Sequence, residues 1–348
     1  MRRYVDNSKD AQRLLATPTS IFTTLISDLQ HARATIDMEF YIFEADRIGG
    51  VVADILCRKA RQGLSVRLVI DGFGSRSMSR ALHRRMRSSG VQIVVTSAIS
   101  LRRNHRKMVI IDGAIAYVGG ANIADRYVVG NDLGVWHDVM MRFTGDGVKL
   151  LAKIFERDFC RRDSGAIVVS PSDFAPMIYW SDSVGGVSMS LLFDEVASSA
   201  QSELVLVTPY FLATPRVLKT LTRVRSRGVR VVVIVPKRCD VWVVDELMRH
   251  SISEAMACGI DVEVVCKDFV HAKMAFVDSC RVVLGSANID ALSLGINREI
   301  MISTYDRGVC NSARLFINHL RSIAVSASGL DMKSHIPRFV ARMLSPMM

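Results

Sequence analysis

The sequence predicts a duplicated α/β fold, with two mixed β-sheets flanked by helices and a pseudo-twofold relation between the two halves. Two observations lead to this prediction: an internal repeat of long period, and an alternation of helix-like and strand-like segments inside each repeat. The offset is nearly constant, since 168 residues separate Phe43 from Phe211 and corresponding positions elsewhere keep a similar spacing. We therefore expect an N-terminal half at residues 1–170 and a C-terminal half at residues 171–348.

Four pairs of segments carry the repeat, in the same order in both halves. Chance does not keep four segments in order at one offset, so the chain has the pattern of a duplicated domain. The pairs are Ser20–Phe43 with Ser188–Phe211, Val51–Gly72 with Val217–Pro236, Arg84–Val95 with Ser253–Val265, and Asn104–Asn122 with Val270–Asn288.

The elements of the first half follow from the spacing of its apolar residues. Apolar positions three and four apart predict a helix at Ile21–Ala34, and a run rich in β-formers predicts a strand at Thr35–Phe43. A second helix at Val51–Gln62 stops at Gly63, which suits the C′ position. The next elements are a strand at Val66–Ile70, a helix at Arg80–Ser89, a strand at Val91–Val95, and paired strands at Met108–Ile111 and Ile115–Val118 around the turn Asp112–Gly113.

The chain is basic, with a net charge of +11. This balance favours anionic partners, namely nucleic acid, an anionic membrane surface or phosphorylated substrates, although an excess of arginine also aids solubility. The N-terminus lacks the apolar core of a signal peptide, and no apolar run approaches the roughly 18–20 residues of a transmembrane helix. Seven cysteines without paired or zinc-like spacing favour a reducing, cytosolic compartment.

Each half contains the motif His-x-Lys-x4-Asp. Alternation along a strand places the His and the Lys of each copy on one face. An ammonium beside an imidazole suits an anionic phosphodiester, because the Lys stabilises charge on phosphoryl oxygens and the His can be a nucleophile or an acid near neutral pH. The aspartates belong to the tight turn one strand beyond, where we expect them to hold the turn or the Lys in place. The two copies are His105/Lys107/Asp112 and His271/Lys273/Asp278.

A run of small residues ending in asparagine follows each motif at the same spacing. These runs are Gly119-Gly120-Ala121-Asn122 and Gly285-Ser286-Ala287-Asn288. Small residues, here Gly120 and Ser286, let a phosphate approach the backbone closely. The amides of Asn122 and Asn288 can donate hydrogen bonds to phosphoryl oxygens. We therefore expect both runs to contact the phosphate of the substrate.

A carboxylate comes later in each half, Asp138 after Trp136-His137 and Glu299 after Asn297-Arg298. A nucleophilic His needs a carboxylate on its other ring nitrogen, which fixes the tautomer and stabilises the charged ring. Asp138 and Glu299 are the candidates for this role. His137 fits a substrate contact and a structural role beside Trp136 about equally well.

At these residues the chain resembles the phospholipase D superfamily, and within it the bacterial cardiolipin synthases of the phospholipase D type. The resemblance covers nearly the whole chain and implies a phospholipase D-like fold with one active site at the interface of the halves. Besides the two motifs, it rests on Met38–Phe43, Asp71–Ser75, Trp136–Asp138, Thr208–Phe211, Gly285–Asp290 leading to Asn297 and Glu299, and the ending Arg342–Pro346.

The resemblance implies a transferase of phospholipid biosynthesis that works through a phosphohistidine intermediate. One His attacks the phosphorus of a phosphatidylglycerol, and the other protonates the departing glycerol oxygen. The second His then takes the proton from the hydroxyl of another phosphatidylglycerol, so that cardiolipin and glycerol result. By analogy His105 is the nucleophile and His271 the acid and base, although the residues themselves leave this open. No metal or organic cofactor is implied, and a monomer is sufficient because the duplication unites both half-sites.

Two departures from the family pattern concern the membrane and the head group. Leu292 stands where cardiolipin synthases usually have an arginine, two residues after Asp290. This difference affects lipid head-group contacts more than the chemistry. The family's usual N-terminal transmembrane helices are absent, so the expectation is either a truncated chain or a naturally short, peripheral protein on the cytoplasmic side of a bacterial cell membrane.

A basic rim and an amphipathic tail are two candidate membrane contacts. The tail Ile336–Met348 places apolar residues at helical spacing with arginines between them, which fits shallow insertion or packing against the domain. The rim is formed by loop and helix arginines that could hold anionic head groups, although three of them, Arg80, Arg84 and Arg87, also fit one solvated helix face. Its members are Arg76, Arg80, Arg84, Arg85, Arg102 and Arg103.

Three other interpretations remain open. With water as the acceptor, the same site is a phospholipase D that hydrolyses phospholipid head groups. The superfamily also contains phosphodiesterases and nucleases, and the basic charge suits DNA, but the Thr208–Phe211 and Phe73–Ser75 elements favour lipid over nucleic acid. A non-catalytic anion-binding protein is disfavoured because no motif residue is lost from either half.

Overall fold

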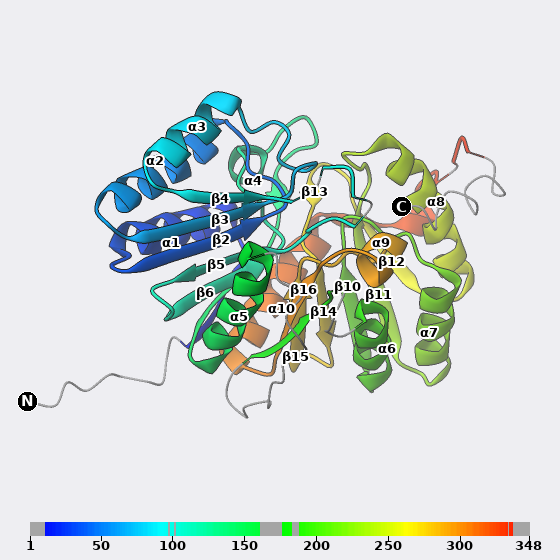
Figure 1. Ribbon diagram of the computed structural model, residues 1–348. Coiled ribbons are helices and arrows are strands. Elements are labelled where there is room, and N and C mark those ends of the chain that lie inside the picture. Colours follow the sequence, from blue (N-terminus) through cyan, green and yellow to red (C-terminus); the bar gives the residue numbers. More distant parts are fainter. Residues whose placement is uncertain are drawn as a thin grey trace, which may run out of the picture.

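The computed structural model describes residues 11–96, 98–100, 102–160, 176–182, 188–332 and 334–336. The expected boundary between residues 170 and 171, and the tail beyond Ile336, lie outside these residues. Within the described part, the chain forms two large mixed β-sheets that lie side by side, with helices on both faces of each sheet (Figure 1).

The first sheet comes from the N-terminal part of the chain. Its seven described strands run in the order β1-β8-β6-β5-β2-β3-β4. β2 pairs in parallel with β3 and antiparallel with β5, so the two kinds of pairing meet at the centre of the sheet. The strands are β1 (Gln12–Leu15), β2 (Thr35–Phe40), β3 (Ser65–Ile70), β4 (Gln92–Val95), β5 (Lys107–Ile111), β6 (Ile115–Gly119) and β8 (Met140–Thr144).

The second sheet repeats this plan. Its eight described strands run in the order β17-β12-β11-β10-β14-β15-β16-β9, and β10 pairs in parallel with β11 and antiparallel with β14, as β2 does with β3 and β5. The matching order confirms the predicted duplication, and β17 is an added edge strand. The strands are β9 (Met177–Trp180), β10 (Glu203–Val207), β11 (Arg230–Pro236), β12 (Asp261–Val265), β14 (Met274–Val277), β15 (Arg281–Gly285), β16 (Ile300–Thr304) and β17 (Ala324–Ser326).

The helices form three layers around the sheets (Figure 1). One group covers the outer face of the first sheet, a second covers the outer face of the second sheet, and two helices lie between the sheets. The groups are α1 (Pro18–His31), α2 (Arg47–Arg61) and α3 (Arg80–Ser88); α6 (Met189–Ser199), α7 (Pro215–Ser226) and α8 (Trp242–Ala257); and, between the sheets, α5 (Asp146–Cys160) and α10 (Arg307–Ile323). Two short helices, α4 (Arg126–Val129) and α9 (Ala291–Gly295), lie in the loops.

Alternation along the strands divides the apolar residues between cores. On β5, Met108 and Ile110 enter the core between the sheets, while Val109 and Ile111 enter the outer core under α1 and α2. The central core joins residues of both halves, such as Phe143 and Val232. The halves are therefore packed against each other through a shared apolar interior.

The elements predicted for the first half are present, but the helix starts lie up to four residues earlier, and α1 and β2 each end three residues early, at His31 and Phe40. α1 begins at Pro18 because the Thr17 side chain accepts a hydrogen bond from the Ser20 amide, and α2 begins at Arg47 because Asp46 caps it in the same way. These caps lie outside the apolar pattern from which the starts were predicted. Gly63 has a φ of +92°, the left-handed conformation expected of it.

Among the described residues, two short backbone connections join the halves. β7 (Trp136–His137) pairs in parallel with β13 (Phe269–Val270), and Asn104 forms a bridge with Arg298. Both connections lie directly beside a motif histidine, so the backbone that carries each His is held by the opposite half.

Candidate active site

The two motifs meet at the interface of the halves. His105 precedes β5, and its backbone amide donates to the Arg298 carbonyl at 2.9 Å. His271 precedes β14, and its amide donates to the His137 carbonyl at 2.8 Å. Each His therefore lies beside the segment of the other half that carries a predicted carboxylate.

The carboxylates contact the histidines in a crossed arrangement. Glu299 Oε1 lies 3.0 Å from Nδ1 of His105, and Asp138 Oδ2 lies 2.6 Å from Nδ1 of His271. Each half thus supplies the carboxylate for the other half's His. An Nδ1–H that donates to a carboxylate leaves Nε2 with its lone pair, which is the atom available to react.

The two pairs differ in their electrostatics. Burial would raise the pKa of Glu299, but the neighbouring His105 and its hydrogen bond hold that pKa below the usual value. Burial raises the pKa of Asp138 to about 6, although Lys273 opposes the rise. Burial lowers the pKa of both histidines, and the charges of Lys273 and Lys107 lower that of His271 further. The two carboxylates therefore differ, since the pKa of Glu299 lies below its usual value and that of Asp138 lies above its own.

Both motif lysines are buried at the site. Lys107 is 0% exposed and Lys273 1%, and each ammonium donates to the carbonyl oxygen of its own motif His. Lys273 Nζ also lies 3.0 Å from both ring nitrogens of His271. Burial lowers the pKa of Lys273 to about 8 and that of Lys107 well below its usual value. An anionic phosphate at this place would stabilise both ammonium groups, because its negative charge offsets the unfavourable burial of their positive charge.

The two asparagines have different surroundings. Asn122 accepts a hydrogen bond from the Ile42 amide at 3.0 Å, and its amide nitrogen donates to the Tyr127 hydroxyl at 2.7 Å. The side-chain oxygen of Asn288 is buried without a hydrogen-bond partner among the described residues. Contact of both amides with a phosphate stays a prediction.

The small residues lie against the carboxylates. A Cβ added to Gly120 would come within 2.2 Å of Asp138 Oδ1, so only glycine permits this carboxylate to lie here. At the matching position Ser286 donates its hydroxyl proton to Glu299 Oε2. Contact of Gly120 and Ser286 with a phosphate, which the sequence predicts, stays a prediction. The structure adds a contact that was not foreseen, namely support of the carboxylate.

The motif aspartates lie away from the histidines, at the far ends of β5 and β14. Asp112 and Asp278 both adopt positive φ, at 53° and 49°. The Asp112 carboxylate accepts hydrogen bonds from the backbone amides of Arg33, Ala34 and Thr35. Asp278 repeats this pattern on the amides of residues 201–203. This geometry agrees with the expected role in holding a turn.

Aromatic rings that the sequence analysis left without a role surround the histidines. The Tyr41 ring lies 4.9 Å from that of His105, and the Tyr127 ring 5.1 Å from that of His271, both edge to face. Trp136 lies 5.2 Å from His271. These rings pack against the two imidazoles. Tyr41 lies in the Met38–Phe43 segment that carries the family resemblance, so its place at the site could have been predicted from the sequence. No feature of the sequence pointed to Tyr127.

A buried ionic cluster behind His105 was also missed. Arg106 is fully buried and donates to the Asp158 carboxylate, to the Ser181 carbonyl at 2.8 Å and to the Glu299 carbonyl at 3.3 Å. Its position between His105 and Lys107 turns it to the opposite face of the strand. The second half has Ala272 at this place, so the two halves differ beneath the site.

Comparison with known proteins places these features in a family. Residues 25–159 and 194–322 match the family model described as cardiolipin synthase, PLD-like domain. A cardiolipin synthase of Geobacillus sp. (strain WCH70) is 29% identical over 97% of this chain and 72% of its own length. A probable cardiolipin synthase of Bacillus subtilis (strain 168) is 31% identical over 85% of this chain, and the match spans 63% of that protein.

Solved structures share the fold. The phosphatidylserine synthase of Haemophilus influenzae Rd KW20 aligns with a TM-score of 0.77 over 97% of this chain and 92% of its own, at 13% sequence identity. The polyphosphate kinase of Porphyromonas gingivalis aligns with a TM-score of 0.65 over 90% of this chain and 48% of its own, at 16% identity. At these identities the likeness shows the fold alone, which is the duplicated α/β architecture predicted from the sequence.

Proposed function

Since the chain belongs to the cardiolipin synthase family of phospholipase D-like proteins, we propose that it is a phosphatidyltransferase that converts two phosphatidylglycerol molecules into cardiolipin and glycerol. The observation that carries this proposal is the crossed pairing of His105 with Glu299 and of His271 with Asp138, with both motif lysines buried beside them. Such a site offers two imidazoles and two cations to one phosphodiester, which suits two successive displacements at phosphorus.

In the first step, His105 Nε2 forms a bond to phosphorus while the bond from phosphorus to the glycerol oxygen breaks. His105 acquires positive charge in this step, and the firmly ionised Glu299 stabilises that charge. His271 delivers a proton to the departing glycerol oxygen. The anionic phosphate offsets the lysine charges that lower the pKa of His271, which favours the protonated ring when substrate is bound.

In the second step, His271 takes the proton from the hydroxyl of a second phosphatidylglycerol, whose oxygen bonds to phosphorus as the bond to His105 breaks. Asp138 accepts the Nδ1–H of His271 and so fixes the tautomer in which Nε2 can take and give the proton. These roles for the two histidines match those expected from the family resemblance.

We further propose that the protein acts as a monomer at the cytoplasmic surface of a bacterial membrane. No helix in the described part of the chain has both the length and the apolar character needed to cross a bilayer. Trp242 is 66% exposed at the start of α8, and Phe73 is 41% exposed with the Arg103 guanidinium 4.2 Å from its ring centroid. Exposed aromatics with adjacent cations suit an anionic lipid surface. All seven cysteines are free thiols, which accords with a reducing compartment.

Charged side chains near Phe73 affect the pKa of Tyr41 at the candidate site. Burial and the charge of Asp71 raise the pKa of Tyr41 to about 12, while Arg103 and Arg76 oppose the rise. The Tyr41 ring contacts His105, so the arginines that hold Phe73 border the site. A membrane contact made by Phe73 would therefore lie close to the reacting groups.

Incubation with phosphatidylglycerol vesicles, followed by separation of the lipids, tests the proposed activity. Cardiolipin with an equal amount of glycerol is the expected result. Phosphatidic acid in place of cardiolipin would make water the acceptor and the enzyme a phospholipase D. Cleavage of DNA without any lipid product would overturn the proposal. His105→Ala is expected to remove whichever activity is seen.

A further inference from the structure

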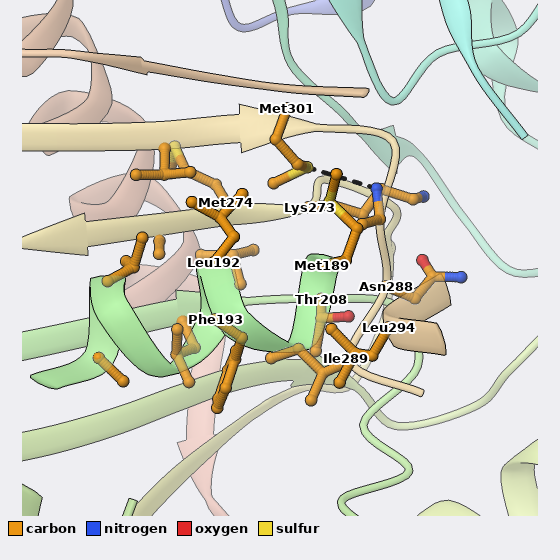
Figure 2. Close-up of a pocket in the computed structure, with 17 residues that line it drawn as sticks. Met189, Leu192, Phe193, Thr208, Lys273, Met274, Asn288, Ile289, Leu294 and Met301 are labelled. Carbon is orange, nitrogen blue, oxygen red and sulfur yellow. Dashed lines mark hydrogen bonds between the residues drawn. The ribbon is translucent and has the colours of Figure 1, made fainter. Parts of the chain in front are cut away.

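An apolar cavity lies in the C-terminal half between α6 and strands β14, β15 and β16 (Figure 2). Its volume is about 60 Å³. Side chains of α6, among them Met189 and Phe193, form one wall, and Ala275, Val283 and Met301 from the sheet form another. The cavity therefore occupies the outer core of this half, where close packing is the rule.

One end of the cavity lies at the candidate active site. Thr208, Lys273 and Asn288 contribute the polar part of its lining. The Lys273 ammonium reaches His271, so the aliphatic stem of the same side chain borders the cavity. In Figure 2 the Asn288 amide points away from the apolar side chains. A group bound at the Lys273 ammonium would thus lie next to the mouth of an apolar space.

The N-terminal half shows what fills the corresponding space. In the second sheet Ala275 pairs with Val283 across β14 and β15, and both line the cavity. At the matching places of the first sheet, Val109 pairs with Tyr117 across β5 and β6. Tyr117 is 0% exposed, and its hydroxyl donates to the carboxylate of Asp28 on α1. Larger side chains thus fill the first half, and smaller ones leave the second half open.

An unfilled apolar space destabilises a folded protein, because its lining loses contacts. The first half shows that this fold can fill the position with two larger residues. The open space lies in the half that contains Lys273 and His271. Two of its lining residues, Met189 and Met301, have flexible unbranched side chains that can move aside for a ligand.

We infer that this cavity receives a hydrocarbon chain of the phospholipid whose phosphate lies at Lys273. The inference rests on the proposed function, because it assumes a phospholipid substrate. Apolar cavities of about 150 Å³ take up benzene in other proteins. This cavity, at about 60 Å³, is smaller, so it has room for at most a short length of one acyl chain, and a longer stretch requires the methionines to move. The Val109–Tyr117 pair closes the other half to a chain.

Methyl resonances of methionine test binding directly, since the chain contains matched positions in both halves. Met301 lines the cavity, and Met140 is its buried counterpart on β8. The His105→Ala variant is titrated with dihexanoyl phosphatidylglycerol, and separately with glycerophosphoglycerol, which has the same head group and no chains. We expect Met301 to shift with the lipid alone, and Met140 to stay in place. Equal shifts in both halves, or none, would overturn the inference.

Filling the cavity tests its use during turnover. Val283→Tyr copies the residue of the first half, and Ala275→Val is a smaller change that serves if the first does not fold. We expect either to raise KM for long-chain phosphatidylglycerol about tenfold or more, with turnover of the chainless substrate bis(p-nitrophenyl) phosphate unchanged. Val109→Ala, the matched control, should leave both the KM for long-chain phosphatidylglycerol and the turnover of bis(p-nitrophenyl) phosphate unchanged.

The two possible failures are distinguishable. If the wild-type protein makes no cardiolipin, the proposed function is wrong, whatever the cavity variants do. If the wild type makes cardiolipin and the filled variants keep the wild-type KM, the function stands and the cavity does not hold the chain.

Discussion

Glu299 Oε1 lies 3.0 Å from Nδ1 of His105, although 194 residues separate the two in the chain and they belong to different halves. The reverse pair, Asp138 with His271, spans 133 residues. Neither half can therefore orient its own motif His. The duplication has produced one site from two incomplete ones.

Glu299→Gln is expected to lower kcat about a hundredfold or more, because the neutral amide cannot stabilise a cationic His105. The rate of cardiolipin formation from phosphatidylglycerol measures the effect. Glu195→Gln, which removes a carboxylate paired with Arg281 on the outer face of the same half, is the matched control and should keep the wild-type rate. A Glu299→Gln enzyme of normal rate would show that His105 does not depend on this carboxylate.

Lys273→Met is expected to stabilise the fold while it removes activity. The ammonium is buried, and its pKa falls to about 8 in the folded protein. Charging this side chain in the fold is unfavourable, so its replacement by an apolar residue should raise the free energy of unfolding at pH 7 by about 1–3 kcal/mol. Chemical denaturation measures this difference, and a loss of stability would contradict the expectation.

The pH dependence of that difference has a definite sign. Below pH 8, Lys273 is charged in both the folded and the unfolded protein, and the unfavourable burial is complete. Above pH 8, the folded protein releases the proton while the unfolded chain keeps it up to its ordinary pKa of about 10.4. The wild type should therefore gain stability relative to Lys273→Met across this interval.

Asp112→Ala is expected to lower stability rather than catalytic chemistry. Burial would raise the pKa of Asp112, but the hydrogen bonds from Thr35, Ala34 and Arg33 hold it below the usual value. The carboxylate thus stabilises the fold above the pKa of the unfolded chain, and this contribution disappears as the pH falls through the lower pKa of the folded protein. We expect a loss of about 1.5–3 kcal/mol at pH 7, with kcat per folded molecule near that of the wild type.

Asp278→Ala provides the internal comparison, since Asp278 makes the same contacts in the second half. The two variants should have similar melting temperatures. A large fall in kcat for either variant, at a temperature where it remains folded, would place the aspartate in the chemistry instead.

Trp242→Ala is expected to weaken binding to phosphatidylglycerol vesicles about tenfold, because a largely exposed indole loses its apolar contact with the bilayer. Sedimentation with vesicles gives the partition coefficient. Leu315→Ala on α10 is the matched control, since Leu315 is 71% exposed and is not part of the proposed membrane contact. Equal loss in both variants would remove Trp242 from the membrane contact.

The duplication could be predicted from the sequence because paired segments recur at a nearly constant offset. The chemistry could be predicted because each half carries a copy of the His-x-Lys-x4-Asp motif. Asp138 and Glu299 were identified as partners for histidines, but which carboxylate serves which His was not, since that depends on how the segments before β8 and β16 cross the interface. The Arg106 cluster was missed for a related reason. A charged residue between His105 and Lys107 gives no sign of burial, and its partner Asp158 is distant in the chain.

Catalysis depends on the docking of the two halves, because β7 and β13, which come from different halves, pair directly beside the site. This pairing holds Trp136 beside Phe269 and places Asp138 at His271, while the bridge of Asn104 with Arg298 does the same for Glu299 and His105. A disturbance that separates these short segments removes both carboxylates from both histidines at once. Mild heating or denaturant should therefore abolish activity in a single transition, before the hydrogen bonds within either sheet are lost.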